Sequence, residues 1–165
     1  MFNIRKATTE DIPCIHSMAM IVFPETYKDI LSSQQIDYMM EWMYSENNLH
    51  RQMTLEGHIY YIAYHHEMPA GYLSIQAEGT HTYHLQKLYI LPTHQGMNLG
   101  RLLFQQAITA IKELHPTPCQ MRLNVNRNNQ ALIFYQKMGM TIVDEGDFPI
   151  GNGYFMNDYI MGMEI

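Results

Sequence analysis

The stretch HLQKLYILPTHQGMNLG, residues 84–100, joins a strand pattern to the most regular helical pattern in the chain. A strand is predicted from about His81 to Leu91, and Pro92 ends it because proline has no N–H for the hydrogen-bond ladder. Apolar residues then recur at helical spacing over residues 99–114, and His115-Pro116 ends that pattern. The sequence therefore predicts a strand, a glycine-bearing loop and a long helix in this order.

The loop QGMNLGR, residues 95–101, has the chemistry of an anion site. Gly96 and Gly100 remove side chains where a phosphate must approach closely, and the helix N-terminus adds partial positive charge. Arg101 adds a formal charge beside them. The alternative is an ordinary connection in which glycine only forms the turn. The spacing is neither that of a P-loop nor that of a dinucleotide fingerprint.

Outward from this centre, the patterns predict an α/β fold whose elements follow the order β-α-α-β-β-β-α-β-α-β-β. Such an order favours a mixed, mostly antiparallel sheet flanked by helices. Residues 146–154, rich in glycine and aromatic residues, are expected to form an excursion between the last two strands. The remaining predicted strands are 2–5, 59–64, 70–76, 120–125, 140–145 and 155–164, and the remaining predicted helices start near residues 12, 33 and 128.

Length and charge limit the class of protein. A chain of 165 residues is long enough for one domain with its own core, so we expect a single domain over residues 1–165. Its formal net charge of −6 argues against nucleic-acid binding, which needs clustered lysine and arginine, and favours a cationic small molecule as partner. No signal peptide or membrane segment is predicted, and Cys14 and Cys119 are expected to be free thiols in the cytoplasm.

A second motif, NNQALIFYQKMGM, follows at residues 128–140. Together with residues 84–100 it resembles the two signatures of the GNAT superfamily of N-acetyltransferases. These are a strand followed by Gln/Arg-x-x-Gly-x-Gly/Ala, and a helix of the pattern Asn-x-x-Ala-x-x-Phe-Tyr-x-Lys-x-Gly-Phe. Asn98 replaces the first glycine of the first pattern, and asparagine is the other residue that best tolerates a left-handed backbone. Met140 replaces the terminal phenylalanine of the second, which is a tolerable apolar exchange.

The resemblance implies a single-domain GNAT-type fold, acetyl-CoA as cosubstrate and no metal. It also implies that the backbone of Leu88, Tyr89 and Ile90 faces the thioester and the pantetheine arm, with an N–H near Leu88 as oxyanion donor. The loop would hold the diphosphate, with Asn128 and Lys137 as further contacts. The residues expected to bind acetyl-CoA are Leu88, Tyr89, Ile90, Gln95, Gly96, Met97, Asn98, Leu99, Gly100, Arg101, Asn128, Tyr135 and Lys137.

Two residues are candidates for acid–base catalysis. Tyr135 stands at the position of the family's general acid, which protonates the departing thiolate; the alternative is a core tyrosine on an apolar helix face. His84 stands where many members carry a glutamate base, and imidazole can accept a proton from an ammonium group directly or through water. The alternatives for His84 are a structural histidine, with a water chain or another group as the base. His81 and His84 point to opposite faces of a strand and predict no metal site.

Aromatic residues interleaved with carboxylates in the first helices and the closing strands are typical of a site for a polyamine or similar amine. The alternative is that these carboxylates lie on solvated faces. The segments FPETYK, residues 23–28, and FYQKMGM, residues 134–140, together with the 146–154 excursion, look similar to the bacterial spermidine/spermine N-acetyltransferases. Two other functions stay open, namely acetylation of an amino acid, peptide or protein amine, and an acyl-CoA-binding module with little catalysis. A homodimer is a further possibility, since dimers are common among such relatives. The residues predicted to contact the acceptor are Glu25, Tyr27, Glu41, Trp42, Asp147 and Phe148.

Overall fold

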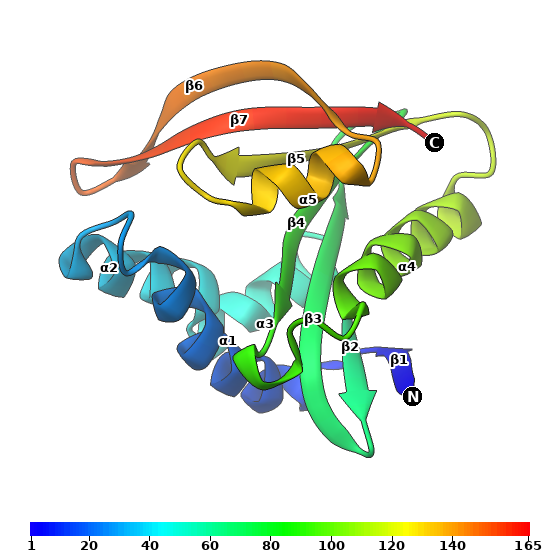
Figure 1. The fold of residues 1–165 in the computed structure, drawn as a ribbon, viewed down its shortest axis with the longest axis horizontal. Helices are drawn as coiled ribbons and strands as arrows, with labels where there is room; N and C mark the ends of the chain where they lie inside the picture. Colours follow the sequence, from blue (N-terminus) through cyan, green and yellow to red (C-terminus); the bar gives the residue numbers. More distant parts are fainter.

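Seven strands form one sheet in the computed structural model, which describes residues 1–165 (Figure 1). The strand order is β1-β2-β3-β4-β5-β7-β6, and every neighbouring pair is antiparallel except β4 and β5. This confirms the predicted α/β class with a mixed, mostly antiparallel sheet. The strands are β1 (Phe2–Lys6), β2 (Ile59–His65), β3 (Met68–Ala77), β4 (Thr82–Ile90), β5 (Gln120–Asn126), β6 (Thr141–Gly151) and β7 (Tyr154–Glu164).

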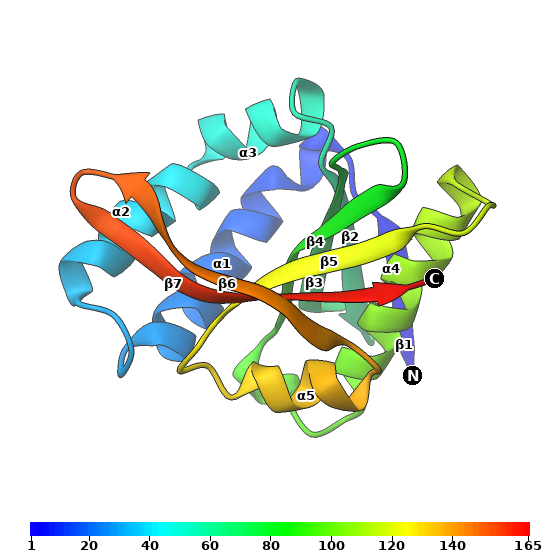
Figure 2. The same ribbon diagram turned by 90° about the horizontal axis from the view of Figure 1, so that it is seen from above.

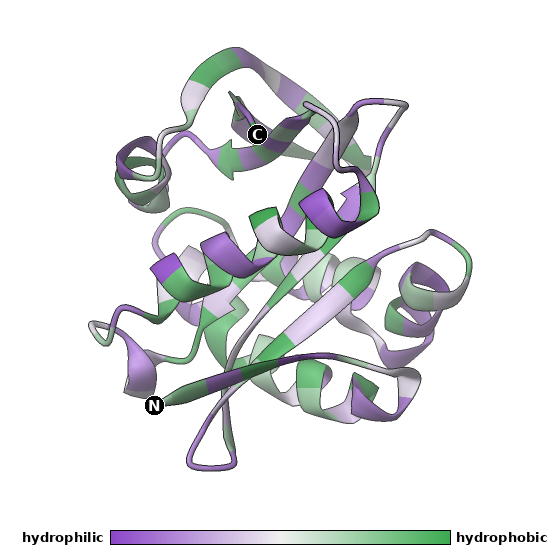
Figure 3. Cartoon of the chain, turned by 90° about the vertical axis from the view of Figure 1, so that its right-hand side faces the viewer, coloured by the Kyte–Doolittle hydropathy of each residue, from purple (hydrophilic) through white to green (hydrophobic).

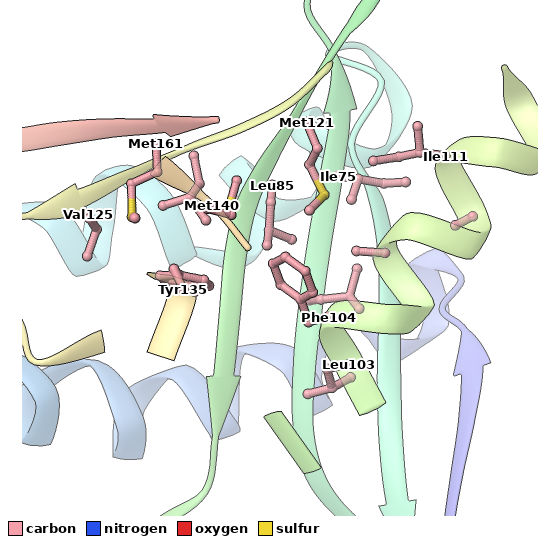
Figure 4. Packing of buried hydrophobic residues seen from close by; sticks show 14 of the residues in the cluster. Ile75, Leu85, Leu103, Phe104, Ile111, Met121, Val125, Tyr135, Met140 and Met161 are labelled. Carbon is pink, nitrogen blue, oxygen red and sulfur yellow. The ribbon is translucent and has the colours of Figure 1, made fainter. Parts of the chain in front are cut away.

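Helices cover both faces of the sheet and enclose two separate cores (Figure 2). One core packs α4 and α5 against the strands, with Leu103, Phe104 and Ile111 of α4 facing Ile75 and Leu85 (Figure 4). The other core packs the first three helices against the opposite face. The apolar residues of each helix recur as bands along the ribbon (Figure 3). The helices are α1 (Ile12–Tyr27), α2 (Ser33–Tyr44), α3 (Glu46–Thr54), α4 (Leu99–Leu114) and α5 (Ala131–Lys137).

The two central strands, β4 and β5, separate after their first three residues. β4 pairs with β5 only over Thr82–His84, opposite residues 120–122. On its other edge β4 keeps its pairing with β3 as far as Ile90, with a register shift between Ser74 and Ile75. Beyond His84 the backbone of β4 therefore has no partner on the β5 side, and the strands leave an opening between them.

Three predictions about the elements were wrong or incomplete, namely the absence of α3, the excursion at residues 146–154 and the start of α5. The sequence reading missed α3, because this short helix is polar and buries only Leu49 and Gln52. The predicted 146–154 excursion is mostly strand, since β6 runs to Gly151 and a tight turn at Asn152-Gly153, both at positive φ, leads into β7. Pro149 is tolerated there because β6 is an edge strand.

The second motif also begins its helix later than predicted. α5 starts at Ala131 rather than at Asn128. The Asn129 Oδ1 atom accepts the Ala131 N–H, and the Asn126 Oδ1 atom accepts the Asn128 N–H. These side chains satisfy backbone donors outside the helix and so delay its start.

Candidate functional site

The opening between β4 and β5 is a cleft of about 470 Å³. Its walls are residues 85–90 of β4 and residues 123–125 of β5, and residues 129–131, Phe134 and Tyr135 lie at its α5 side. Because β4 has no partner strand here, its backbone groups are free to bind a ligand. Of the residues predicted to bind acetyl-CoA, six line this cleft: Leu88, Tyr89, Ile90, Gln95, Gly100 and Tyr135.

The N-terminus of α4 lies beside this cleft and has the geometry predicted for an anion site. Asn98 adopts a left-handed backbone with φ of 65°, as expected from its replacing a glycine, and Gly96 also has positive φ. The Asn98 side chain makes no capping hydrogen bond to α4, so it does not occupy the first N–H groups of this helix. A cavity of about 340 Å³ at this point is lined by seven of the predicted residues: Ile90, Gly96, Asn98, Leu99, Gly100, Arg101 and Lys137.

Close packing joins the two cavities. Ile90, Gly100 and Phe134 line both of them. A Cβ atom at Gly100 would lie 3.3 Å from atoms of Ile90 and Phe134, so only glycine fits there without displacing a neighbour. Two predicted residues, Met97 and Asn128, line neither cavity, whereas Asn129 does line the cleft.

A second large cavity, of about 500 Å³, lies on the α1–α3 side and meets the cleft. Five residues line both spaces: Tyr27, Gln86, Lys87, Tyr89 and Asn124. At this junction the hydroxyl groups of Tyr27 and Tyr89 are 3.2 Å apart. We name this second space the acceptor cavity, because a group bound there can reach a group held in the cleft. Its ionisable residues are Tyr27, Tyr44, Arg51, Glu56, His58, Glu78, His84, Lys87 and Tyr89.

Tyr135 lies on α5 with its ring among the residues of the first core, beside Val125 and Met140 (Figure 4). It is 8% exposed and lines the cleft. Burial raises the pKa of Tyr135 well above its usual value. The phenol therefore keeps its proton at neutral pH. The same desolvation would raise the proton affinity of a thiolate formed beside it.

His84 lines the acceptor cavity, not the cleft. Its Nδ1 atom lies 3.0 Å from Oε1 of Glu78, although the two groups are not aligned as a hydrogen bond. Burial lowers the pKa of His84, and the carboxylate of Glu78 opposes that effect. The imidazole is therefore neutral at pH 7 and able to accept a proton.

The six residues predicted to contact the acceptor divide into two groups. Tyr27 and Trp42 line the acceptor cavity. The other four lie elsewhere: Glu25 pairs with Lys28, Asp147 pairs with Arg127, Glu41 lines a separate shallow cavity, and Phe148 lines no cavity described here. None of these four residues lines the acceptor cavity.

The sequence reading overlooked the carboxylates that do line the cavity. Glu56 follows α3, and Glu78 lies in the turn between β3 and β4. It also overlooked Lys87, a lysine inside an apolar strand that is only 6% exposed. A charged residue within such a strand was the one available signal, because lysine is almost never buried without a specific environment.

No cluster of three or more His, Cys, Asp or Glu residues could hold a metal ion. No helix is long and apolar enough to cross a membrane.

Comparisons with known proteins agree on one fold. Residues 27–148 match the family model described as the acetyltransferase (GNAT) domain. The PaiA N-acetyltransferase from Thermoplasma acidophilum, solved with coenzyme A, is 23% identical with a TM-score of 0.83, covering 100% of this chain and 99% of that one. The ribosomal-protein-S18-alanine N-acetyltransferase from Escherichia coli is 17% identical with a TM-score of 0.73, covering 100% and 94%. Arabidopsis thaliana Naa50, solved with the bisubstrate analogue CoA-Ac-MVNAL, is 15% identical with a TM-score of 0.71, covering 99% of each chain.

Proposed function

The chain belongs to the GNAT family of acetyl-CoA-dependent N-acetyltransferases, and we propose that it acetylates a small primary amine bound in the acceptor cavity. The observation that carries this proposal is the junction of the two spaces. The cleft between β4 and β5 suits acetyl-CoA, and the acceptor cavity opens into it at Tyr27 and Tyr89. A ternary complex with direct attack on the thioester fits such an arrangement, because both substrates can be held side by side.

In this mechanism the backbone of β4 near Leu88 binds the thioester oxygen, and the α4 N-terminus with Arg101 binds the diphosphate. His84 accepts the proton that the amine loses, directly or through water. Tyr135 donates its proton to the departing thiolate of coenzyme A. Tyr135 lines the cleft and His84 lines the acceptor cavity, and the two spaces meet at the junction. This arrangement suits an acid and a base that act on opposite sides of one carbonyl group.

A polyamine is the first acceptor to test. Its reacting amine would reach the junction, while Trp42, Glu56 and Glu78 could hold methylene groups and further ammonium groups. The carboxylates proposed here are those of the cavity wall and not Glu25, Glu41 or Asp147.

Two hydrogen bonds between α2 and the β6–β7 hairpin favour a compact acceptor over a polypeptide. α2 is bridged to the β6–β7 hairpin, because Tyr38 Oη donates to the Ile150 carbonyl at 2.7 Å and Gln35 Nε2 donates to the Phe155 carbonyl at 2.7 Å. Met39 and Met156 line the acceptor cavity next to this bridge. The cavity is therefore walled where α2 meets the hairpin. Acetylation of a peptide N-terminus stays the second candidate, because two proteins of similar fold are described with such acceptors.

The test is a screen of acetyl-CoA consumption with spermidine, spermine, diamines, amino acids and short peptides. We expect turnover with polyamines or diamines. Turnover with a peptide and none with a polyamine would make the acceptor proposal wrong while leaving the acetyltransferase activity intact. We also propose a reducing, cytoplasmic location, because Cys14 and Cys119 are both free thiols.

A further inference from the structure

Two side-chain amides, Gln86 of β4 and Asn124 of β5, line both the cleft and the acceptor cavity. The last paired residues of these two parallel strands are His84 and Arg122, so each amide lies two residues beyond that pair. The two amides therefore stand on neighbouring strands at the point where these strands begin to separate. The proposed reaction gives neither of them a role.

A β-bulge in β4 turns Gln86 toward the acceptor cavity. Ile75 pairs with Leu85 and Ser74 pairs with Lys87, so β4 has one extra residue, Gln86, between these pairs. Leu85 belongs to the core formed with α4 and α5, whereas Gln86 and Lys87 both line the acceptor cavity. The bulge therefore places two consecutive side chains at the wall of this cavity.

Hydrogen bonds fix the orientation of the Gln86 amide. The backbone carbonyl of Glu56 can only accept, and Gln76 donates to it from Nε2 at 2.7 Å. The other end of the same amide, Gln76 Oε1, accepts from Gln86 Nε2 at 2.8 Å. The NH2 group of Gln86 is therefore held by a residue of β3, on the side of β4 away from β5.

The amide of Asn124 is held in the same way from the opposite side. Its Nδ2 atom donates to Oδ2 of Asp158 at 3.2 Å, and an ionised carboxylate can only accept. Asp158 is 2% exposed and lies on β7, on the side of β5 away from β4. Burial raises the pKa of Asp158, whereas the Asn124 N–H and the charge of Arg127 favour the ionised form. Asp158 thus orients Asn124 without itself lining the cleft or the acceptor cavity.

The carbonyl oxygens of both amides are left without partners. Gln86 Oε1 and Asn124 Oδ1 accept no hydrogen bond from the chain, because each amide is anchored through its nitrogen. The only buried side-chain N or O atom without a hydrogen bond is His84 Nδ1, so both oxygens are accessible. Two free acceptors therefore border the junction at which the proposed reaction brings the amine to the thioester.

We propose that Gln86 and Asn124 are specificity-determining residues that hold the reacting amino group through its two N–H groups. The inference rests on the proposed function. A neutral primary amine has two N–H donors and one lone pair, so two acceptors leave the lone pair free for the thioester carbon. The amide oxygens add no negative charge, whereas a carboxylate at this place would stabilise the ammonium form, which has no lone pair.

The same two hydrogen bonds stabilise the transition state. The reacting form is the free base, which is in equilibrium with the ammonium ion in solution. As its nitrogen bonds to the thioester carbon it becomes positive, so both hydrogen bonds strengthen. The nitrogen then gives one proton to His84, and the C–S bond breaks as in the proposed mechanism. Gln76 and Asp158 are positioning residues, because they act through the two amides.

The test compares putrescine, whose amines are primary, with N,N′-dimethylputrescine, whose amines are secondary. A secondary amine has one N–H and uses one oxygen, so the wild-type kcat/KM should be about tenfold or more higher for putrescine. Gln86→Met and Asn124→Leu each remove one oxygen at similar side-chain volume. Each should lower kcat/KM about tenfold for putrescine but less than about twofold for the dimethyl compound, which keeps one acceptor.

Equal losses for the two diamines would overturn the inference, because a merely structural role lowers both values alike. Equal wild-type kcat/KM values for the two diamines would overturn it as well. Gln105→Met and Asn47→Leu are the matched controls, since both residues are exposed and line neither space. If Asn124→Leu does not fold, Asp158→Asn replaces it. An amide at position 158 can donate as well as accept, so it no longer selects one orientation of Asn124, and the preference for putrescine should fall by less.

The proposed function and this inference fail in different ways. A chain that acetylates no amine would make the proposed function wrong, and this inference with it. A chain that acetylates amines but shows an unchanged preference in the variants would overturn this inference alone. If the screen identifies an amine other than a diamine, the same comparison with that amine and its N-methyl derivative decides the role of the two amides.

Discussion

The imidazole of His84 lies 3.0 Å from the carboxylate of Glu78, with both side chains at the wall of the acceptor cavity. The carboxylate of Glu78 therefore lies beside a neutral imidazole, can orient its ring and raises its pKa. A glutamate at this position would place a second carboxylate beside Glu78, and burial together with the like charge would raise its pKa. In the proposed mechanism a buried histidine instead acts as the base without adding a further negative charge to the cavity.

His84→Ala is expected to lower kcat by about 10²-fold or more, because general-base catalysis typically contributes this much. The acidic limb of the rate–pH profile, which reports protonation of the base, should disappear or move. Glu78→Gln should shift that limb to lower pH, because the carboxylate opposes the burial that lowers the pKa of His84. His50→Ala, at an exposed histidine of α3, is the control. An unshifted limb in His84→Ala would remove His84 from the role of base.

Tyr135→Phe should lower kcat by about 10²-fold or more while leaving the Kd for acetyl-CoA nearly unchanged. The variant loses the proton donor for the thiolate but keeps the ring that packs against Phe104 and Phe134. Tyr83→Phe, outside both the cleft and the acceptor cavity, serves as its control. Turnover assays measure kcat, and calorimetry measures the Kd for acetyl-CoA. A wild-type chain that binds acetyl-CoA but acetylates no amine would instead indicate a binding module.

Asn98→Gly should leave acetyl-CoA binding nearly unchanged, whereas Asn98→Val should weaken it. Position 98 has φ of 65°, and a left-handed backbone costs a non-glycine residue about 1–2 kcal/mol, with β-branched side chains worst. The valine variant is expected to distort the loop that precedes α4 or to lower Tm. Asn3→Val, in an extended strand, is the control. Equal Kd values for the glycine and valine variants would contradict a role of this backbone in binding.

The free energy of unfolding should rise as the pH increases from about 7 to about 9. Burial lowers the pKa of Lys87 to about 7 in the folded chain, far below its value in an unfolded chain. Between these two values the unfolded state binds more protons, so stability rises with pH by up to about 1.4 kcal/mol per pH unit. Urea denaturation over this range should show the rise in the wild-type chain and in Lys6→Met. Lys87→Met should lack it, and an equal slope in that variant would contradict the assignment.

The strand, loop and helix beside the cleft could be predicted from the sequence because these elements are contiguous in the chain. A strand, a glycine-bearing loop and a helix at residues 84–114 place their own groups together through local geometry alone. The structure accordingly has α4 at Leu99–Leu114 and a left-handed Asn98, as predicted. Even here some side chains could not be placed, since Leu114 at the end of the apolar pattern is exposed, whereas Phe104 is buried.

The acceptor side depends on contacts between segments far apart in the chain, and the sequence did not reveal them. The carboxylates of Glu25, Glu41 and Asp147 were selected by their position in the expected segments. Successive residues of a helix, such as those around Glu25 and Glu41, differ in direction by 100°, and successive residues of a strand, such as those around Asp147, point to opposite faces. Glu56, Glu78 and Lys87 were not selected because their environment comes from α3, β2 and β4 together.

The sequence by itself determined the class of fold, the family resemblance and the glycine-bearing loop before α4, because periodicity and local backbone preferences act over a few neighbouring residues. Only the tertiary structure decided which charged residues line the acceptor cavity and which lysine is buried at its wall. The physical reason is that the pKa of Lys87 and the partners of His84 depend on desolvation and on packed neighbours from other elements. Those quantities exist only when the sheet and its helices are assembled.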